Sequence, residues 1–265
     1  MTDNIKRALI TGASGGLGLQ FAHLLAEMGY YLVLVSRNEK ILKSLSVELE
    51  KKYKIKAIVM PADLSLTGGA KKLYNQCRKN KLDISLLVNN AGRGMVGSCS
   101  DQDCDDMEQL AVLNSISPMT LSSLISQDMI ARGSGYILNV GSVVGLQPIP
   151  YFAPYAASKS FAHSYSISMH YELKRKGVAV TCVIPGFMST GFDEGAGITN
   201  KTYLKISNSS AMDPRKVAET GLKALFKGRC VVVAGFPNKA ANFFSYLTPK
   251  RITAWLLEKT LRKLV

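Results

Sequence analysis

The residues "RALITGASGGLGLQ", 7–20, join a short apolar run to a glycine-rich turn and then to a helix-like pattern. Gly12, Gly16 and Gly18 permit a tight turn, and the following helix would offer its unpaired N–H groups and positive end to a phosphate. The glycine spacing, four and then two, differs from the general GxGxxG dinucleotide pattern. The order of strand, glycine-rich turn and helix still favours a dinucleotide-binding unit at the start of the chain.

The rest of the chain alternates short apolar runs with segments of helical length. The apolar runs are mostly continuous, which is typical of strands buried on both faces of a parallel sheet. They read "YLVLVS", "KAIVMPA", "ISLLVNN", "GYILNVGS", "VAVTCVIP" and "CVVVAG". The pattern predicts one α/β domain over 1–265, a Rossmann-like doubly wound parallel sheet of about seven strands with helices on both faces.

The composition is that of an ordinary globular protein. Hydrophobic residues make up 47% of the 265 positions and charged residues 20%, which argues against disorder. No apolar run approaches the roughly eighteen residues of a membrane span. The N-terminus enters the first strand almost at once and leaves no room for a signal peptide, so we expect a cytoplasmic protein.

Charge and cysteine content bear on the partners. The net charge is +14, but the basic residues are scattered and no nucleic-acid-binding motif accompanies them. We therefore expect solvated helix faces and no nucleic-acid interface. The five cysteines form no CxxC pair and the three histidines have no ligand cluster around them. Reduced thiols and the absence of a metal site are the corresponding predictions.

The end of the second candidate strand, "VLVSRNEK", discriminates between nicotinamide cofactors. NAD-binding sites usually place an Asp or Glu there to hold the ribose hydroxyls. Here Ser36, Arg37 and Asn38 take that place, and an Arg can form a forked, charge-assisted contact with a 2′-phosphate. Glu39 lies close by and argues the other way, but the pattern favours NADP(H).

The stretch "PYAASKS" places Tyr155 and Lys159 four residues apart with only small residues between them. On a helix, side chains at this spacing share a face, and a nearby ammonium lowers the pKa of a phenol towards neutrality. The spacing alone is weak evidence, because Tyr246 and Lys250 repeat it. Pro249 stands between that second pair and predicts a broken helix there.

Together these motifs carry a family resemblance. The chain resembles the short-chain dehydrogenase/reductases over nearly its whole length. The markers are, in order, "TGASGGLG", "ADLS", "NNAG", Asn114, Ser142, Tyr155, Lys159 and "PGFMST". The resemblance implies that Tyr155 protonates a carbonyl oxygen as hydride arrives, that Lys159 lowers its pKa and holds the ribose, and that Ser142 hydrogen-bonds the same oxygen. Taken alone, Ser142 would be an ordinary turn serine.

The resemblance also implies a set of cofactor contacts. Asp63 would lie near the adenine, "NNAG" beside the cofactor, and four residues of "PGFMST" along the nicotinamide, namely Pro185, Gly186, Met188 and Thr190. The full set is Gly12, Ser14, Gly15, Gly16, Leu17, Gly18, Ser36, Arg37, Asn38, Asp63, Leu64, Asn90, Ala91, Gly92, Tyr155, Lys159, Pro185, Gly186, Met188 and Thr190. A homo-oligomer, dimer or tetramer, is a further family expectation.

Asn114 precedes Pro118 by four residues. Pro118 has no N–H to donate to the carbonyl of Asn114, which is therefore available to water or a side chain. In the resembled family the equivalent carbonyl holds a water that links the Lys to solvent. A simple helix kink is the alternative, and the two interpretations are compatible.

Two segments are expected to surround the substrate. The irregular stretch 189–213 is too long for a simple connection and matches the family's substrate lid. The apolar stretch "GLQPIPYFA", 145–153, would form another wall, and neither carries a cluster of Arg or Lys. An apolar carbonyl compound or secondary alcohol, acyl-chain-like or steroid-like, is the predicted substrate. The alternative is a non-catalytic nucleotide-sensing scaffold of the same fold, against which the complete set of catalytic residues argues.

The last segment, 249–265, predicts a basic amphipathic helix. Its apolar side would carry Ile252, Trp255, Leu256, Leu261 and Leu264, and its polar side Lys250, Arg251, Lys259, Arg262 and Lys263. Such a helix suits weak peripheral contact with an anionic membrane surface. Amphipathic helices more often pack on their own domain or on a partner subunit, and this is the interpretation that we favour.

Overall fold

The computed structural model describes residues 6–188, 190, 192, 196, 198 and 200–262, without the side chains of 206, 241 and 244–246. Ser189, Lys263, Leu264 and part of the expected lid over 189–213 therefore lie outside the described residues. No described helix is long and apolar enough to cross a membrane.

Seven parallel strands form one sheet in the order β3-β2-β1-β4-β5-β6-β7. The strands are β1 (Arg7–Thr11), β2 (Tyr31–Val35), β3 (Ala57–Val59), β4 (Leu86–Asn89), β5 (Gly135–Val140), β6 (Val178–Ile184) and β7 (Val231–Val233). This confirms the predicted doubly wound α/β fold. The order reverses between β1 and β4, which is where ligands bind in such sheets.

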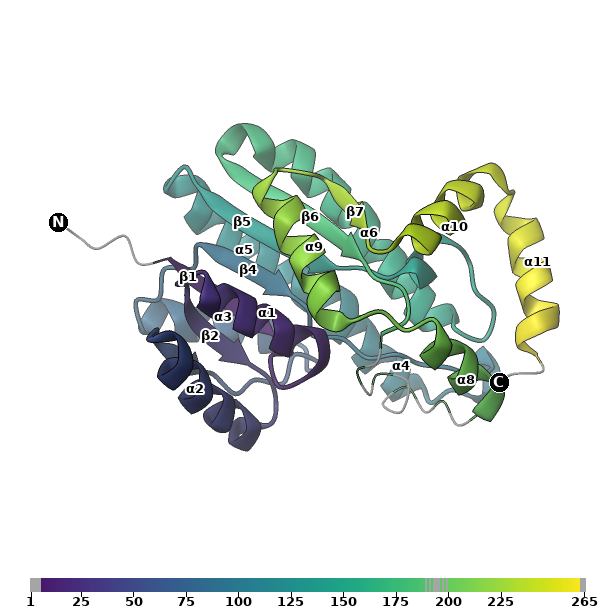
Figure 1. Ribbon diagram of the computed structural model, residues 1–265, viewed down its shortest axis with the longest axis horizontal. Helices are drawn as coiled ribbons and strands as arrows, with labels where there is room; N and C mark the ends of the chain where they lie inside the picture. The colour runs from purple at the N-terminus through teal and green to yellow at the C-terminus, as the bar shows by residue number, and fades with distance from the viewer. Residues whose placement is uncertain are drawn as a thin grey trace.

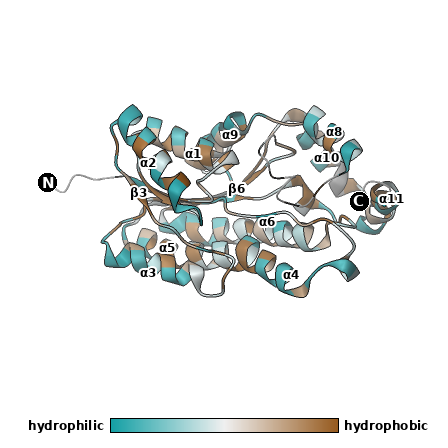
Figure 2. Ribbon diagram, turned by 90° about the horizontal axis from the view of Figure 1, so that it is seen from below, coloured by the Kyte–Doolittle hydropathy of each residue, from teal (hydrophilic) through white to brown (hydrophobic). Residues whose placement is uncertain are grey.

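Helices cover both faces of the sheet. They are α1 (Gly16–Glu27), α2 (Glu39–Tyr53), α3 (Gly69–Lys79), α4 (Cys104–Ala111), α5 (Ser117–Ala131), α6 (Ala153–Leu173), α8 (Lys201–Ser209), α9 (Pro214–Phe226), α10 (Phe236–Leu247) and α11 (Lys250–Leu261). Figure 2 shows α1, α2 and α9 on one face and α3, α5 and α6 on the other.

The continuous apolar strands fill the core on both sides. In β2, Leu32 and Leu34 join the cluster under α1 and α9, whereas Val33 and Val35 join the cluster under α3 and α5. Successive side chains of a strand point to opposite faces, so a strand buried on both faces must be apolar throughout. The same rule explains why the strands of this chain could be recognised without alternation.

The C-terminal segment corrects one prediction. Figure 1 shows α8, α10 and α11 gathered at the end of the molecule opposite the N-terminus. We expected the apolar side of the last helix to pack on its own domain or on a partner subunit. Leu261 does pack against buried residues of the domain, but Ile252, Trp255 and Leu256 face solvent, so packing on the domain is wrong for them. The helix turns residues 253, 254, 257, 258 and 261 inwards instead.

Candidate active site

A cavity of about 620 Å³ lies at the carboxyl ends of the strands, across the point where the strand order reverses. Because parallel strands all end at the same edge, loops that are far apart in the sequence meet there. The cavity has a polar end, formed after β1, β2 and β4, and an aromatic end, formed by later segments. It contains nearly every predicted site residue.

The turn after β1 is shaped for close approach of a ligand. Gly12 has φ +66°, and a Cβ there would lie 2.8 Å from the side-chain nitrogen of Asn90. A Cβ on Gly18 would collide with the carbonyl oxygen of Gly12. Helix α1 begins directly afterwards, with no side-chain cap at Gly15 and no acidic residue in its first turn. Its first N–H groups therefore remain suited to an anion such as a pyrophosphate.

The residues after β4 are clamped to this turn. The backbone N–H of Asn90 donates to the hydroxyl oxygen of Thr11 at 2.9 Å, and that of Ala91 to the same oxygen at 3.0 Å. The side-chain amide of Asn90 also donates to the Thr11 carbonyl at 2.9 Å. The "NNAG" motif thus fixes the distance between the two strand ends that flank the cavity.

Ser36 and Arg37 line the cavity at the end of β2. The hydroxyl oxygen of Ser36 is buried and has no hydrogen-bond partner in the described part of the protein. Glu39, which argued for NAD, pairs with Lys43 at 2.7 Å on the surface of α2. Ser36 and Arg37 thus line the cavity where a 2′-phosphate would lie, and the nearby carboxylate of Glu39 is paired with Lys43.

Asp63 and Asn38 also line this end of the cavity. Burial opposes ionisation of Asp63, but hydrogen bonds from the Ser65 hydroxyl and N–H, with the charge of Arg37, hold the pKa of this carboxyl below its ordinary value. Asn38 caps α2 by accepting from the N–H of Ile41 at 3.1 Å. Asn38 therefore has a structural function besides facing the cavity.

Tyr155 and Lys159 lie together on α6 and line the middle of the cavity. The ammonium nitrogen of Lys159 is 5.9 Å from the Tyr155 ring centroid and donates to the Val140 carbonyl at 2.9 Å. The repeated pair does not share this geometry, because α10 ends at Leu247 and α11 begins at Lys250.

Burial lowers the pKa of Lys159 to about 8, against an ordinary value of 10.5. The charged ammonium loses its hydration there, and the hydrogen bond to the Val140 carbonyl replaces only part of that hydration. A lysine poised this close to neutrality is typical of sites where a proton is exchanged, although structural burial can do the same.

Ser142 follows β5 directly and caps a short 3₁₀ turn, Val143–Leu146. Its hydroxyl oxygen accepts from the N–H of Val144 at 3.2 Å, and the side chain is buried. A hydroxyl that accepts in this way still has its hydrogen to donate. Ser142 thus combines the turn function of an ordinary serine with a position in the cavity wall.

Asn114 is buried and does not line the cavity; it lies in a π-helical turn over Val112–Ile116. Its side chain accepts from the Arg93 N–H at 3.0 Å and donates to the Arg93 carbonyl at 2.9 Å and the Ser158 hydroxyl at 3.0 Å. The expected disturbance before Pro118 takes the form of this turn, in which the Ser117 N–H bonds back to Val112. Asn114 therefore joins the loop after "NNAG" to α6.

The opposite end of the cavity is aromatic. The Phe192 ring lies 5.5 Å from the Tyr155 ring, and Phe152 stacks on Tyr203 with their centroids 5.9 Å apart. Phe192 and Tyr203 belong to the expected lid segment, and Phe152 to the expected apolar wall. This end offers apolar surface beside the Tyr155 phenol.

The predicted site residues occupy these positions as a group. All of them line the cavity except Gly18, which packs on the Gly12 backbone, and Asn114. Sequence reasoning missed Arg93, whose guanidinium pairs with Asp106 at 2.9 Å at the cavity margin. Arg93 directly follows the "NNAG" motif, and this position could have identified it as a residue near the cofactor. It also missed several apolar lining residues, namely Val96, Leu113, Val144 and Phe187.

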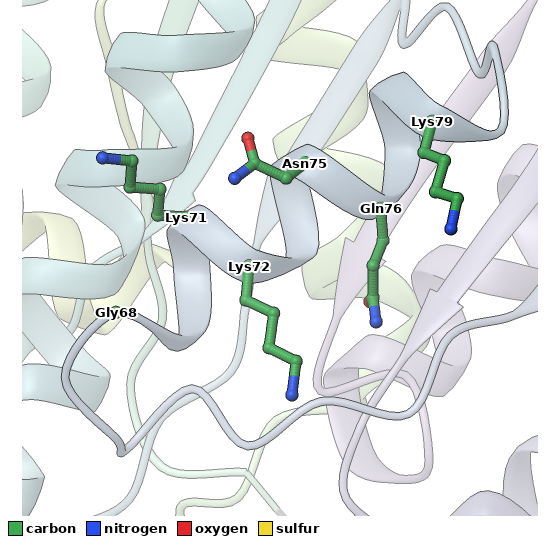
Figure 3. A pocket seen from close by; sticks show the side chains of 6 residues that line it. All are labelled: Gly68, Lys71, Lys72, Asn75, Gln76 and Lys79. Atoms are coloured by element: carbon green, nitrogen blue, oxygen red, sulfur yellow. The ribbon is translucent and has the colours of Figure 1, made fainter.

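A second hollow lies on the outer side of α3, away from this cavity (Figure 3). Lys71, Lys72 and Lys79 border it, but their side chains are exposed and diverge from one another. Among the described residues, no group of His, Cys, Asp and Glu is arranged to hold a metal ion. The cavity at the strand ends, where the predicted catalytic residues Ser142, Tyr155 and Lys159 lie together, is the candidate active site.

A family model described as short chain dehydrogenase matches residues 6–201. The chain belongs to this family. The match covers the glycine turn, the "NNAG" motif and the pair on α6, so it confirms the resemblance drawn from those motifs. This short-chain dehydrogenase has the doubly wound parallel sheet of seven strands that its sequence predicts.

Curated relatives of this short-chain dehydrogenase include proteins named very-long-chain 3-oxoacyl-CoA reductase. The chain is 34% identical over 71% of its length to a very-long-chain 3-oxoacyl-CoA reductase of Pyrenophora tritici-repentis. It is 30% identical over 96% of its length to a protein of the same name from Neurospora crassa. The matched part spans 56% of the Pyrenophora protein and 72% of the Neurospora protein.

A solved structure shares the fold closely. It is a short-chain dehydrogenase from Sphingobium yanoikuyae in complex with NADPH, 26% identical, with a TM-score of 0.81. The alignment covers 91% of this chain and 93% of that one. The likeness therefore extends beyond the residues that the family model matches, into the region after 201.

Proposed function

We propose that the protein is an NADP(H)-dependent oxidoreductase that reduces the carbonyl group of an apolar substrate, with a 3-oxoacyl thioester as the favoured class. The observation that carries the proposal is the single cavity that joins a cradle for a phosphorylated dinucleotide to an aromatic wall. Tyr155, Ser142 and Lys159 line it between the two ends. Reduction of a carbonyl needs a proton donor at that junction.

The cofactor assignment rests on residues of this chain. The glycine turn and the start of α1 would hold the pyrophosphate, and Ser36 with Arg37 the 2′-phosphate. The ligand that the Sphingobium protein contains, NADPH, supports the same choice. When bound, NADPH supplies a hydride to the carbonyl carbon of the substrate.

The chain's own residues would supply the proton and the positioning. Tyr155 donates its phenolic proton to the carbonyl oxygen, which becomes the hydroxyl of the product. The Ser142 hydroxyl donates a hydrogen bond to the same oxygen as negative charge develops there. The Lys159 cation stabilises the phenolate that Tyr155 becomes, until a proton from solvent restores the phenol. We assign Asn114 to the path of that proton. Its side chain is held near Lys159 by hydrogen bonds with the Arg93 backbone and the Ser158 hydroxyl.

The substrate class rests on two independent arguments. The aromatic end of the cavity, built from Phe152, Phe192 and Tyr203, would exclude water from an acyl chain and contact it through dispersion. The curated relatives are named for very-long-chain 3-oxoacyl-CoA reduction. A homo-oligomer and a cytoplasmic location remain proposals from the sequence.

The test is a parallel titration of the purified protein with NADPH and NADH, followed by cofactor fluorescence and then by turnover of 3-oxoacyl-CoA substrates of increasing chain length. We expect preference for NADPH and a kcat/KM that rises with chain length. Binding without turnover of any ketone or thioester would favour the nucleotide-sensing scaffold. Preference for NADH would contradict the assignment of Ser36 and Arg37.

A further inference from the structure

The helices α10 and α11 carry a concentration of exposed large apolar side chains. Each of the six is at least 50% exposed. They are Phe236, Phe243 and Leu247 on α10 and Ile252, Trp255 and Leu256 on α11. Elsewhere among the described residues only Met28, Val47, Leu66 and Tyr171 reach that exposure, and these lie on separate elements. Scattered apolar residues are normal on a surface, whereas a gathering of this kind marks an interaction site.

The spacing of these residues places them on the outer side of each helix. On α10 they are separated by seven and four residues, and on α11 by three and one, so each set shares one face. The inner side of α11 is held to the domain. Leu261 packs against the cluster that contains Tyr155, and Glu258 accepts a hydrogen bond from the Tyr151 hydroxyl at 3.3 Å. The attachment fixes the outer side towards solvent.

Basic residues surround this apolar face. Lys239 on α10 and Lys250, Arg251 and Lys259 on α11 are all exposed. The ammonium nitrogen of Lys259 lies 3.8 Å from the centroid of the Trp255 ring, so cation and indole stand together on the outer side. Glu258 is the one acidic residue in the sequences of α10 and α11. It faces inwards, and its carboxylate also pairs with the Arg262 guanidinium at 2.6 Å. The face thus combines apolar surface with uncompensated positive charge.

We propose that the outer face of α10 and α11, defined by these six apolar residues and bordered by the four basic residues, docks on an anionic lipid surface. Apolar side chains would enter the boundary of headgroups and acyl chains while the basic residues meet the lipid phosphates. The Trp255 indole beside the Lys259 ammonium suits this boundary, where hydrocarbon lies on one side and hydrated headgroups lie on the other. Because α11 contacts the cluster around Tyr155, docking would bring the aromatic end of the cavity next to the bilayer.

A second copy of the chain fits the same face less well. In an interface between two identical faces, residues near the two-fold axis meet their own counterparts. Here Arg251 and Lys259 of the two copies would approach one another with no acidic residue of the outer face to pair with them. The exposed apolar area favours association with a second copy and with a lipid surface alike. The positive charge of the face disfavours a second copy and favours an anionic lipid surface.

The chain contains its own reporter, because Trp255 is its single tryptophan. The full-length protein is mixed with phosphatidylcholine vesicles, with and without phosphatidylglycerol, at low and high salt. We expect co-sedimentation and a blue shift of the indole emission with the anionic vesicles, and little of either with pure phosphatidylcholine. Reversing two charges, in Lys250→Glu/Arg251→Glu, should weaken binding to anionic vesicles by about tenfold or more. Leu256→Glu, which retains the reporter, should do likewise.

Matched variants separate docking from a change in general charge or hydrophobicity. Lys71→Glu/Lys72→Glu reverses two neighbouring exposed charges on α3, the helix of Figure 3, and Val47→Glu alters an exposed apolar residue on α2. Both should bind vesicles like the unmodified protein. An unshifted indole emission, or equal losses in the α3 and α11 variants, would overturn the proposal. Sedimentation as a dimer that Leu256→Glu dissociates, without vesicle binding, would assign the face to a second copy and overturn it as well.

Discussion

The two ends of the cavity are built by different means. The polar end consists of residues that directly follow β1, β2 and β4, where short motifs meet backbone that the sheet already holds in place. The aromatic end brings together Val96, Phe152, Phe192 and Tyr203 from segments that no single motif connects. A phosphate can be bound by backbone N–H groups at any such strand end, whereas an apolar substrate must be matched by side chains. The residues of the polar end can therefore be predicted from sequence motifs, whereas those of the aromatic end are identified only from the folded structure.

The largest effect is expected where the two ends meet. Tyr155→Phe should lower kcat by about a thousandfold, because the variant keeps the ring against Phe192 and removes the proton donor. The dissociation constant for NADPH should change little. The measurement is single-turnover reduction beside a cofactor titration. Tyr171→Phe, an exposed tyrosine on the same helix, is the control, and a Tyr155→Phe enzyme within about tenfold of the unmodified rate would contradict the mechanism.

The second prediction concerns the stability of the cofactor-free protein. Burial holds the pKa of Lys159 at about 8 in the folded state, below its ordinary 10.5, so the folded state releases this proton first. Between these pH values the unfolded state binds more protons, and the free energy of unfolding rises with pH. The contribution is absent below pH 8 and reaches about 3 kcal/mol near pH 10.

Comparison with a variant isolates this contribution. Lys159→Met should be more stable than the unmodified protein at pH 7, and its advantage should shrink as pH rises towards 10. Urea unfolding at a series of pH values measures the difference, in which groups common to both proteins cancel. Tyr155→Phe retains Lys159 and should retain the rise. A difference that does not change with pH would show that the buried ammonium is not destabilised.

A smaller effect tests the polar end alone. Arg37→Asp should weaken NADPH binding by about tenfold to a hundredfold, because charge-assisted hydrogen bonds to the 2′-phosphate are replaced by repulsion. Binding of NADH, which lacks that phosphate, should change little or improve. The ratio of the two dissociation constants is the readout, and Lys40→Asp on the exposed side of α2 is the control. An unchanged ratio would separate Arg37 from cofactor choice.

The sequence predicted the fold and the polar end in detail for a physical reason. The strands are buried on both faces, so their apolar runs are unmistakable, and Gly12, Ser36 and Asn90 occupy strand ends whose position the sheet order determines. Arg93 was missed because its position in the cavity depends on the side-chain contacts of Asn114. Packing of the outward residues of α11 on their own domain was wrongly expected, because periodicity defines an apolar side without saying whether it meets protein or solvent. Packing of that side on a partner subunit stays a prediction.

The smallest effect tests the aromatic end. Phe192→Ala removes the ring beside Tyr155 but leaves the proton donor and the cofactor residues in place. We expect KM for a long-chain 3-oxoacyl thioester to rise about tenfold, the value of one aromatic contact, with kcat and cofactor affinity nearly unchanged. KM for a short ketone should hardly move. Phe161→Ala, on the outer side of α6 against Tyr165, is the control. If KM rises equally for both substrates in Phe192→Ala, the aromatic end positions Tyr155 rather than selecting the substrate. The two ends of the cavity would then depend on each other more than their separate segments indicate.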